Sequence, residues 1–322
     1  MDEKRILYIA AIAAFIVPFS NTIYNPNIAV IQEDFGTSYT LIAATISAYT
    51  LMMALSQLIH GPLSDRFGRK RILLPGLIVY IIANILMYFS WDVYSLIAFR
   101  VLQAIGVSTT VVVGAAVISD IFPRERRGRA MGTYTFVLLV GPTIGPVVGG
   151  VLADAFGWRS IFIFLTIVGS LMALVVYKLL PETLQKPHKS HALAALALLK
   201  DSKTAATCLL GAAVFASIYI FATFLPIVFH ESYGLSSTYI GLAFLLSGIM
   251  LLAGTFIGGR LSDKIDRKKV FISGAFIAFI SVLLSAFWAD ALYPLIAAYA
   301  LFGFGTGLFF PAARVYVIEI GR

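Results

Sequence analysis

The stretch GPLSDRFGRK at Gly61–Lys70 returns 198 positions later as GRLSDKIDRK at Gly259–Lys268. A second pair of segments matches at nearly the same offset, since VYSLIA at 93–98 aligns with LYPLIA at 292–297. Self-similarity at a fixed offset is typical of a chain built from structural repeats. We therefore expect two copies of one architecture, with the decapeptide at the same place in each.

The composition indicates that both copies lie in a membrane. Hydrophobic residues make up 60% of the 322 positions and charged residues 12%, whereas soluble domains carry about 25% charged residues. A soluble fold of this size cannot hide so much apolar surface, because a large share of any folded chain stays outside. A surface that faces lipid removes this conflict.

Apolar runs long enough to cross a bilayer fill most of the chain. A spanning helix needs about 20 apolar residues, and short breaks rich in Gly, Pro, Asp and Arg separate the runs. The first run reads as an uncleaved span, since no small-residue cleavage site follows it. We expect ten spans, at roughly 6–30, 41–60, 72–90, 93–118, 130–153, 160–180, 205–228, 238–259, 270–288 and 292–318.

The basic residues predict the orientation of these spans. Every second break is rich in Lys and Arg. In the breaks on the other side, the only Lys or Arg is Arg159. Basic loops stay in the cytoplasm, so we expect a cytoplasmic N-terminus in a plasma or inner membrane. The formal net charge of +8 is then explained without nucleic acid as a partner. The basic breaks contain Lys4–Arg5, Arg66–Arg71, Arg124–Arg129, Lys178–Lys203 and Arg260–Lys269.

The repeat and the spans together predict the architecture. Six spans separate matching helices, so both copies share one orientation about an axis along the membrane normal, a plan known from transporters. We expect an all-α membrane fold with a six-helix bundle over 1–180, a cytoplasmic linker over 181–203 and a second bundle over 204–322. Within the linker, 192–199 fits either a short helix on the membrane surface or a plain connection. The second bundle has only four helices, so we expect two more in a longer natural chain and no transport by this piece alone.

The decapeptide also carries a specific charge pattern. Gly61 permits close helix approach, and Asp65 and Arg69 stand about one helical turn apart. The stretch resembles the signature loop of the major facilitator superfamily, and the resemblance extends over the whole chain. It implies a charge network that closes the cytoplasmic side in one state and is formed by Asp65, Arg66, Arg69 and Asp120. The alternative is a basic loop that only sets topology.

The second copy of this loop matches less closely. It keeps Gly259, Asp263 and Arg267, but Asp266 stands where the first copy has Gly68. These three residues are the candidate site residues of the second-repeat loop.

Arg100 lies inside the fourth span, about 10 Å below the outer face at 1.5 Å per residue. An arginine inside a span is costly and marks a functional site by default. The stretch from Arg100 through Gln103 to Gly106 resembles the span-four motif of the same superfamily, although Ala104 replaces the usual glycine. The resemblance implies a role in proton coupling or substrate contact. The alternative is an arginine that extends to the outer interface.

Polar and aromatic residues on the first span are candidates for the wall of a substrate pathway. Asn21 and Asn25 share a helix face, and Tyr24 lies beside them. We group them with Arg100 and Gln103 as a candidate substrate or proton pathway. Ordinary packing between helices explains each of them equally well.

The fifth span contains GPTIGPVVGG at Gly141–Gly150. Its glycines recur every four residues and form one smooth helix face, which permits close packing against another helix. Pro142 and Pro146 remove backbone donors between them and favour a bend. The pattern resembles the motif of the exporter branches, and the motifs together resemble the 12-span drug:proton antiporters. The residues that carry it are Gly141, Pro142, Gly145, Pro146 and Gly149.

These observations predict a secondary active transporter that exports small amphipathic compounds or drugs in exchange for protons, as a monomer. No metal-ligand cluster, nucleophile triad or nucleotide loop appears in the sequence, so we expect no enzyme activity and no cofactor. No carboxylate lies inside a span as placed, so coupling would use Asp34 or Asp154 at the outer rim, a carboxylate in missing helices, or none. Arg100 without a carboxylate favours neutral or anionic substrates. The alternative function is a sugar or organic acid carrier of the same superfamily.

Overall fold

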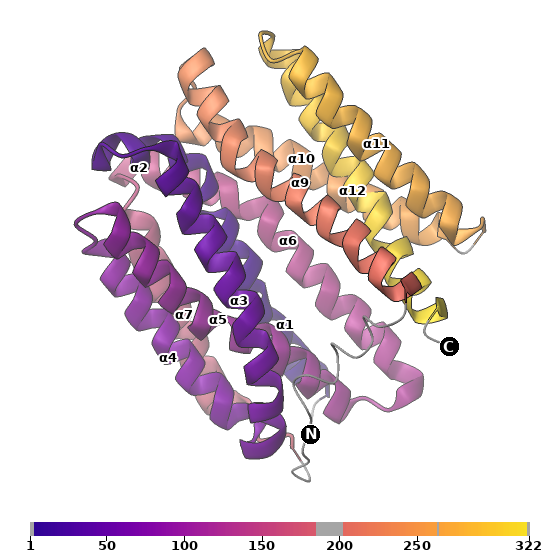
Figure 1. The fold of residues 1–322 in the computed structure, drawn as a ribbon. Coiled ribbons are helices and arrows are strands. Elements are labelled where there is room, and N and C mark those ends of the chain that lie inside the picture. The colour runs from indigo at the N-terminus through magenta and orange to yellow at the C-terminus, as the bar shows by residue number, and fades with distance from the viewer. Residues whose placement is uncertain (1–2, 185–201, 263, 321–322) are drawn as a thin grey trace. The chain divides into compact units, whose positions relative to one another are not determined.

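The computed structural model describes residues 3–184, 202–262 and 264–320 (Figure 1). Within these residues, ten helical segments are long and apolar enough to cross a bilayer, which confirms the predicted spans and the all-α class. The helices are α1 (Glu3–Thr22), α2 (Ile28–Phe35), α3 (Tyr39–Phe67), α4 (Arg69–Tyr88), α5 (Val93–Ile121), α6 (Arg124–Phe156), α7 (Ser160–Leu179), α9 (Ser202–Tyr233), α10 (Ser237–Ser262), α11 (Arg267–Phe287) and α12 (Leu292–Ile320), with a short 3-10 helix η1 (Asn25–Asn27) between α1 and α2.

The chain forms two compact units, Met1–Leu193 and Ala194–Arg322. The linker predicted over 181–203 lies for most of its length outside the described residues, and so does the whole of 192–199. That part of the predicted domain plan stays a prediction.

The first span is interrupted rather than a single straight helix. The α-helical pattern of α1 ends at Thr22, and η1 follows before α2 resumes the span. Pro26 lies in the first turn of η1, where a residue without a backbone N–H is tolerated because that donor has no partner inside the helix. At the interruption, the Asn27 side chain donates to the carbonyl oxygen of Ile23 in the same span.

Each unit has its own set of helix–helix contacts. α1 lies against α6, α5 lies against α3 and α4, and α4 also lies against α7. In the second unit α12 packs against α10 and α11, and an aromatic group of Phe221, Phe244, Tyr299 and Phe302 fills the space between α9, α10 and α12. Each unit therefore has its own core.

Paired glycines repeat the same helix crossing in both units. A Cβ on Gly106 of α5 would lie 2.6 Å from the carbonyl oxygen of Gly76 on α4. A Cβ on Gly305 of α12 would lie 2.9 Å from the carbonyl oxygen of Gly274 on α11. Both contacts are too short for any side chain, so backbone meets backbone at each crossing. The sequence repeat is thus also a repeat of packing geometry.

Candidate functional site

The decapeptide that defines the repeat is mostly helical. α3 continues to Phe67 and α4 begins at Arg69, so the only break is Gly68, with φ at +114°. α3 thus continues past the expected span of 41–60, and α4 begins shortly before the expected span of 72–90. The left-handed backbone at the break favours glycine, which has no Cβ to clash. The turn brings the first residue of α4 back against the last turn of α3.

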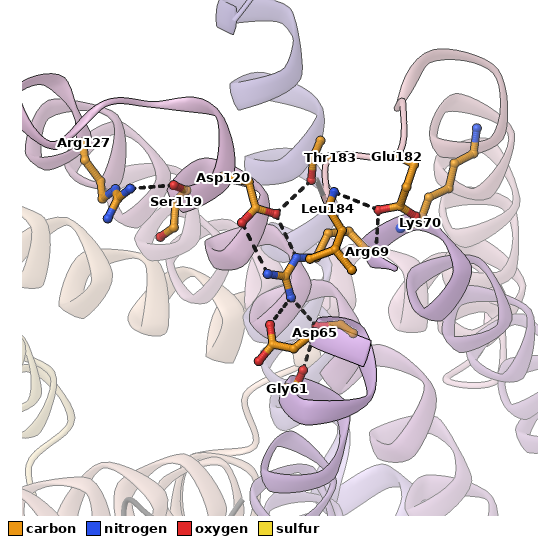
Figure 2. A network of polar contacts seen from close by, with 11 residues as sticks. Gly61, Asp65, Arg69, Lys70, Ser119, Asp120, Arg127, Glu182, Thr183 and Leu184 are labelled. Atoms are coloured by element: carbon orange, nitrogen blue, oxygen red, sulfur yellow. Dashed lines mark hydrogen bonds and ion pairs between the residues drawn. The ribbon is translucent and has the colours of Figure 1, made fainter. Parts of the chain in front are cut away.

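Arg69 is the centre of a charge network at this end of the first unit (Figure 2). Its side chain is only 4% exposed and forms an ion pair with Asp65 on α3. Its Nε donates to Oδ2 of Asp120 on α5 at 2.9 Å, and its Nη2 donates to Oδ1 of the same residue at 3.3 Å. The contact is therefore bidentate. Nη1 also donates to Ser64 Oγ at 2.8 Å. A planar guanidinium suits such a double contact, and here it links the ends of three helices.

A segment after the last helix of this unit completes the network. Thr183 Oγ1 donates to Asp120 Oδ2 at 3.1 Å. The Glu182 carboxylate accepts from the backbone N–H of Arg69 at 2.8 Å and of Lys70 at 3.2 Å. These donors belong to the first turn of α4, where negative charge is favoured by the helix dipole. A Cβ on Gly68 would lie 2.5 Å from Glu182 Oε2, so the carboxylate occupies the space that a larger residue would fill.

Not every residue predicted for this network joins it. Arg66 is exposed, and its guanidinium lies 5.0 Å from the centre of the Phe67 ring rather than against a carboxylate. In the second unit, a Cβ on Gly259 would meet open space. Asp263 lies outside the described residues, and so does the side chain of Arg267, which begins α11.

Arg100 lies in a buried polar cluster within the first unit. It is fully buried, which rules out the interpretation that it extends to the outer interface. Its guanidinium lies 4.5 Å from the ring centres of both Tyr24 and Tyr49. Nη1 donates to Gln103 Oε1 at 2.8 Å, and Gln103 Nε2 donates to Asn84 Oδ1 at 2.9 Å. A cation between two aromatic faces is favourable when desolvated, and the cluster joins four helices around one positive charge.

The candidate residues of the first span are all buried. Tyr24 reaches Arg100 from the interruption after α1, and its hydroxyl accepts from Thr45 Oγ1 at 3.1 Å. Asn25 lies in η1, and its Oδ1 is buried without a hydrogen-bond partner among the described residues. Asn21 precedes the interruption, on the last turn of α1. The interruption therefore places Tyr24 on the arginine.

The glycine face of α6 packs directly on α1. A Cβ on Gly149 would lie 1.8 Å from the Ile23 carbonyl oxygen, and one on Gly145 would lie 2.4 Å from Thr22 Oγ1. Gly141 lies near Phe19, with 3.0 Å between a built Cβ and the backbone nitrogen. α6 continues through Pro142 and Pro146 without a break in its helical pattern. Only glycine permits this approach of two backbones.

A side chain from the interrupted span also holds this contact. Asn27 Nδ2 donates to the carbonyl oxygens of Ile23 and Gly149, each at 3.3 Å. Thr22 Oγ1 donates to the Gly141 carbonyl oxygen at 3.4 Å. Within the interrupted span, the Asn27 side chain supplies a donor to the Ile23 carbonyl, because the backbone N–H of Asn27 donates to Tyr24 instead.

At the opposite end of the unit, Asp34 is held by the loop between α6 and α7. Its Oδ2 accepts from Arg159 Nη1 at 2.7 Å and from Trp158 Nε1 at 3.2 Å. The Arg159 guanidinium stacks 4.2 Å from the Trp158 ring. These contacts join the end of α2 to the loop between α6 and α7.

Carboxylates are confined to the ends of the helices. Each described Asp or Glu lies in a loop or within the first or last turn of a helix, Asp154 included. Among the described residues, no group of three His, Cys, Asp or Glu could hold a metal ion. Arg100, in contrast, places a fully buried guanidinium in the eighth position of α5, away from either end of that helix.

Several residues of these clusters are absent from the sequence-based prediction. Glu182 and Thr183 follow the last span of the unit and so read as the start of a linker. Tyr49 and Asn84 are single polar residues in apolar spans, and Asn27 resembles any other loop amide. For Glu182 and Thr183, the position in the sequence is informative: PET at 181–183 follows a span that ends on the same side of the membrane as the decapeptide.

A family profile and individual relatives both match this chain. The profile of the Major Facilitator Superfamily matches residues 10–317. The chain is 32% identical over 303 residues to citrate exporter 1 of Aspergillus niger, covering 82% of this chain and 58% of that protein. It is 27% identical over 310 residues to a bicyclomycin resistance protein homolog of Haemophilus influenzae. That match covers 91% of this chain and 78% of that protein. The chain thus spans less than two thirds of the fungal relative.

The fold is similar to solved transporter structures. A bacterial homolog of the human lysosomal transporter Spinster, in an inward-facing conformation, superposes with a TM-score of 0.78. The match covers 99% of this chain and 78% of that one at 18% identity. Likeness at this level of identity concerns the fold alone.

Proposed function

The chain belongs to the Major Facilitator Superfamily, whose members transport small molecules across membranes, and on this basis we propose that it is an exporter. The proposed substrates are small amphipathic compounds, including drugs, exchanged for protons by alternating access. The observation that carries this proposal is the backbone contact of Gly145 and Gly149 with α1. It is the packing expected of the exporter motif, and the relatives named for bicyclomycin resistance and citrate export point the same way.

We propose that the Arg69 network acts as a gate at the cytoplasmic side. Its ion pairs with Asp65 and Asp120 hold the ends of α3, α4 and α5 together. Opening of that side would separate these ends and expose the charges to water, which makes the network a two-state element. In the second unit, Gly259, Asp263 and Arg267 would serve the equivalent gate, and the N-terminus would lie in the cytoplasm.

For the substrate pathway we propose the cluster around Arg100, with Gln103 and Tyr24 in direct contact with it and Asn21 and Asn25 nearby on the same span. A fully buried guanidinium attracts anionic or polar groups of a substrate and repels cations. This favours a second candidate function, the export of organic acids, which the name of the fungal citrate exporter also supports. For the proton, the candidates remain Asp34, which pairs with Arg159, and Asp154, which lies in the last turn of α6.

Expression of the full gene in a host that lacks its main drug exporters tests the proposal. Export predicts raised resistance to some members of a drug panel and lower accumulation of a labelled compound. An organic acid exporter instead predicts faster loss of preloaded di- or tricarboxylates, without drug resistance. A protonophore that leaves either transport unchanged contradicts proton exchange, and a host with unchanged phenotypes across both panels contradicts export.

A further inference from the structure

A pocket of about 420 Å³ lies beside the first turn of α4. Lys70, Arg71, Leu74 and Pro75 of α4 line one wall, and Tyr177 of α7 and Glu182 line the other. The pocket therefore combines cations with apolar side chains at the end of two spans. The transport proposal uses none of this surface.

The charge balance of the pocket is positive. The Glu182 carboxylate accepts backbone N–H groups of Arg69, Lys70 and Leu184, so the helix start already compensates its charge. Lys70 Nζ donates to the Tyr177 carbonyl oxygen at 2.7 Å and is held at the rim of the pocket. The Arg71 guanidinium is exposed, with no hydrogen bond or ion pair to another described residue. Two cations thus face the opening, and one of them is available for an anion.

The apolar walls continue from the pocket along the outside of the unit. On α4, Ile78, Ile82 and Ile85 follow Arg71 and Pro75 on one helix face and are each at least 43% exposed. On α7, Leu174 and Leu171 follow Tyr177 and are 49% and 59% exposed. α4 packs against α7, and the two helices lie side by side in Figure 1. Exposed isoleucine and leucine on spanning helices are surfaces for acyl chains.

From these observations we propose that the pocket binds an anionic phospholipid. Arg71 and Lys70 bind the phosphate of the headgroup, Tyr177 lies at the level of the interface, and the acyl chains follow the apolar faces of α4 and α7. Basic pockets between spanning helices suit such headgroups, and tyrosine is enriched at the interface. A free phosphate ion would use the cations but none of the apolar wall, so the lipid is the better match.

Native mass spectrometry of the purified chain in neutral detergent tests this site. The probes are palmitoyl-oleoyl phosphatidylglycerol and the phosphatidylcholine with the same acyl chains. Wild type should retain phosphatidylglycerol in preference to phosphatidylcholine. Lys70→Gln with Arg71→Gln should weaken phosphatidylglycerol binding by about thirtyfold, since each cation near an anionic lipid contributes about fivefold. Equal retention of the two lipids by wild type would overturn the proposal.

The matched control removes the same charge elsewhere. Arg124→Gln with Arg129→Gln changes two exposed arginines at the start of α6, and it should retain phosphatidylglycerol as wild type does. Arg71→Gln alone should fold even if the double variant does not, and should lose about fivefold. Equal loss in the control, or unchanged binding by Arg71→Gln, would show that general surface charge holds the lipid. Displacement of phosphatidylglycerol by millimolar glycerol 3-phosphate would identify a soluble phosphate site and overturn the lipid assignment.

Discussion

Arg69 binds Asp120 through two nitrogens, with Nε 2.9 Å from Oδ2 and Nη2 3.3 Å from Oδ1. This double contact joins the first residue of α4 to the last turn of α5. The guanidinium also pairs with Asp65, so one nearly buried cation serves two carboxylates from different helices. The contact is therefore stronger than an exposed surface pair and is the natural target for mutation.

Asp120→Asn keeps the shape of the side chain and removes its charge. The Arg69 side chain, which is 4% exposed, would then keep a single carboxylate partner, Asp65. We expect a loss of about 2 kcal/mol in the free energy of unfolding, the usual size for a hydrogen bond to a charged group, and slower transport. Thermal unfolding in detergent measures the loss of stability. The control is Asp290→Asn, which changes an exposed loop residue. Asp65→Asn or Asp120→Asn with normal transport would contradict the gate.

Glu182→Ala removes the carboxylate that caps α4. Two backbone N–H groups of the first turn, those of Arg69 and Lys70, would lose their acceptor. Loss of a helix cap costs about 1 kcal/mol, so the variant should unfold more easily by that amount. Glu125→Ala, at an exposed position in the first turn of α6, should cost less. Equal stability of the two variants would show that the cap contributes nothing.

Gly149→Ala inserts a methyl group where the Ile23 carbonyl oxygen would be 1.8 Å away. The helices must separate, and overpacking of this kind costs about 1–3 kcal/mol. Gly132→Ala lies on the same helix with open space around the new atom, and should raise helix stability by about 0.5–1 kcal/mol. Opposite shifts in the unfolding temperature of the two variants are expected. A shift of the same sign would mean that the α1–α6 contact is looser than described.

Arg100→Lys keeps the positive charge but loses the planar group between two rings. Lysine cannot stack on Tyr24 and Tyr49 and still donate to Gln103 in the same geometry. If the guanidinium contacts substrate, both Arg100→Lys and Arg100→Ala should lower the transport rate by at least about tenfold, with Arg100→Ala the more severe. Amounts of folded protein in the membrane provide the control. Normal transport by Arg100→Ala would remove this residue from the pathway.

Much of the fold was predictable because it depends on local properties. About 20 apolar residues per span are enough to identify each helix, and the glycines of the α6 motif indicated a close helix contact before its partner was known. The resemblance of the decapeptide also placed Asp65, Arg69 and Asp120 in one network, and the structure brings these three together.

The remaining contacts depend on residues that only the fold brings close. Glu182 is 113 positions from Arg69, and nothing local in PET signals that its carboxylate will meet a helix start. Arg66 is adjacent in sequence to Asp65 and nevertheless lies outside the network, because it points from a different face of α3. The interruption at η1 combines proline chemistry with contacts of its own side chains to the backbone of α6, so a hydropathy pattern cannot locate it.

The Glu182 cap has a mechanical consequence. Leu184 is the last described residue before the chain continues toward the second unit, and its backbone N–H donates to the same carboxylate that holds the start of α4. One carboxylate therefore fixes both the start of α4 and the last described residue after α7.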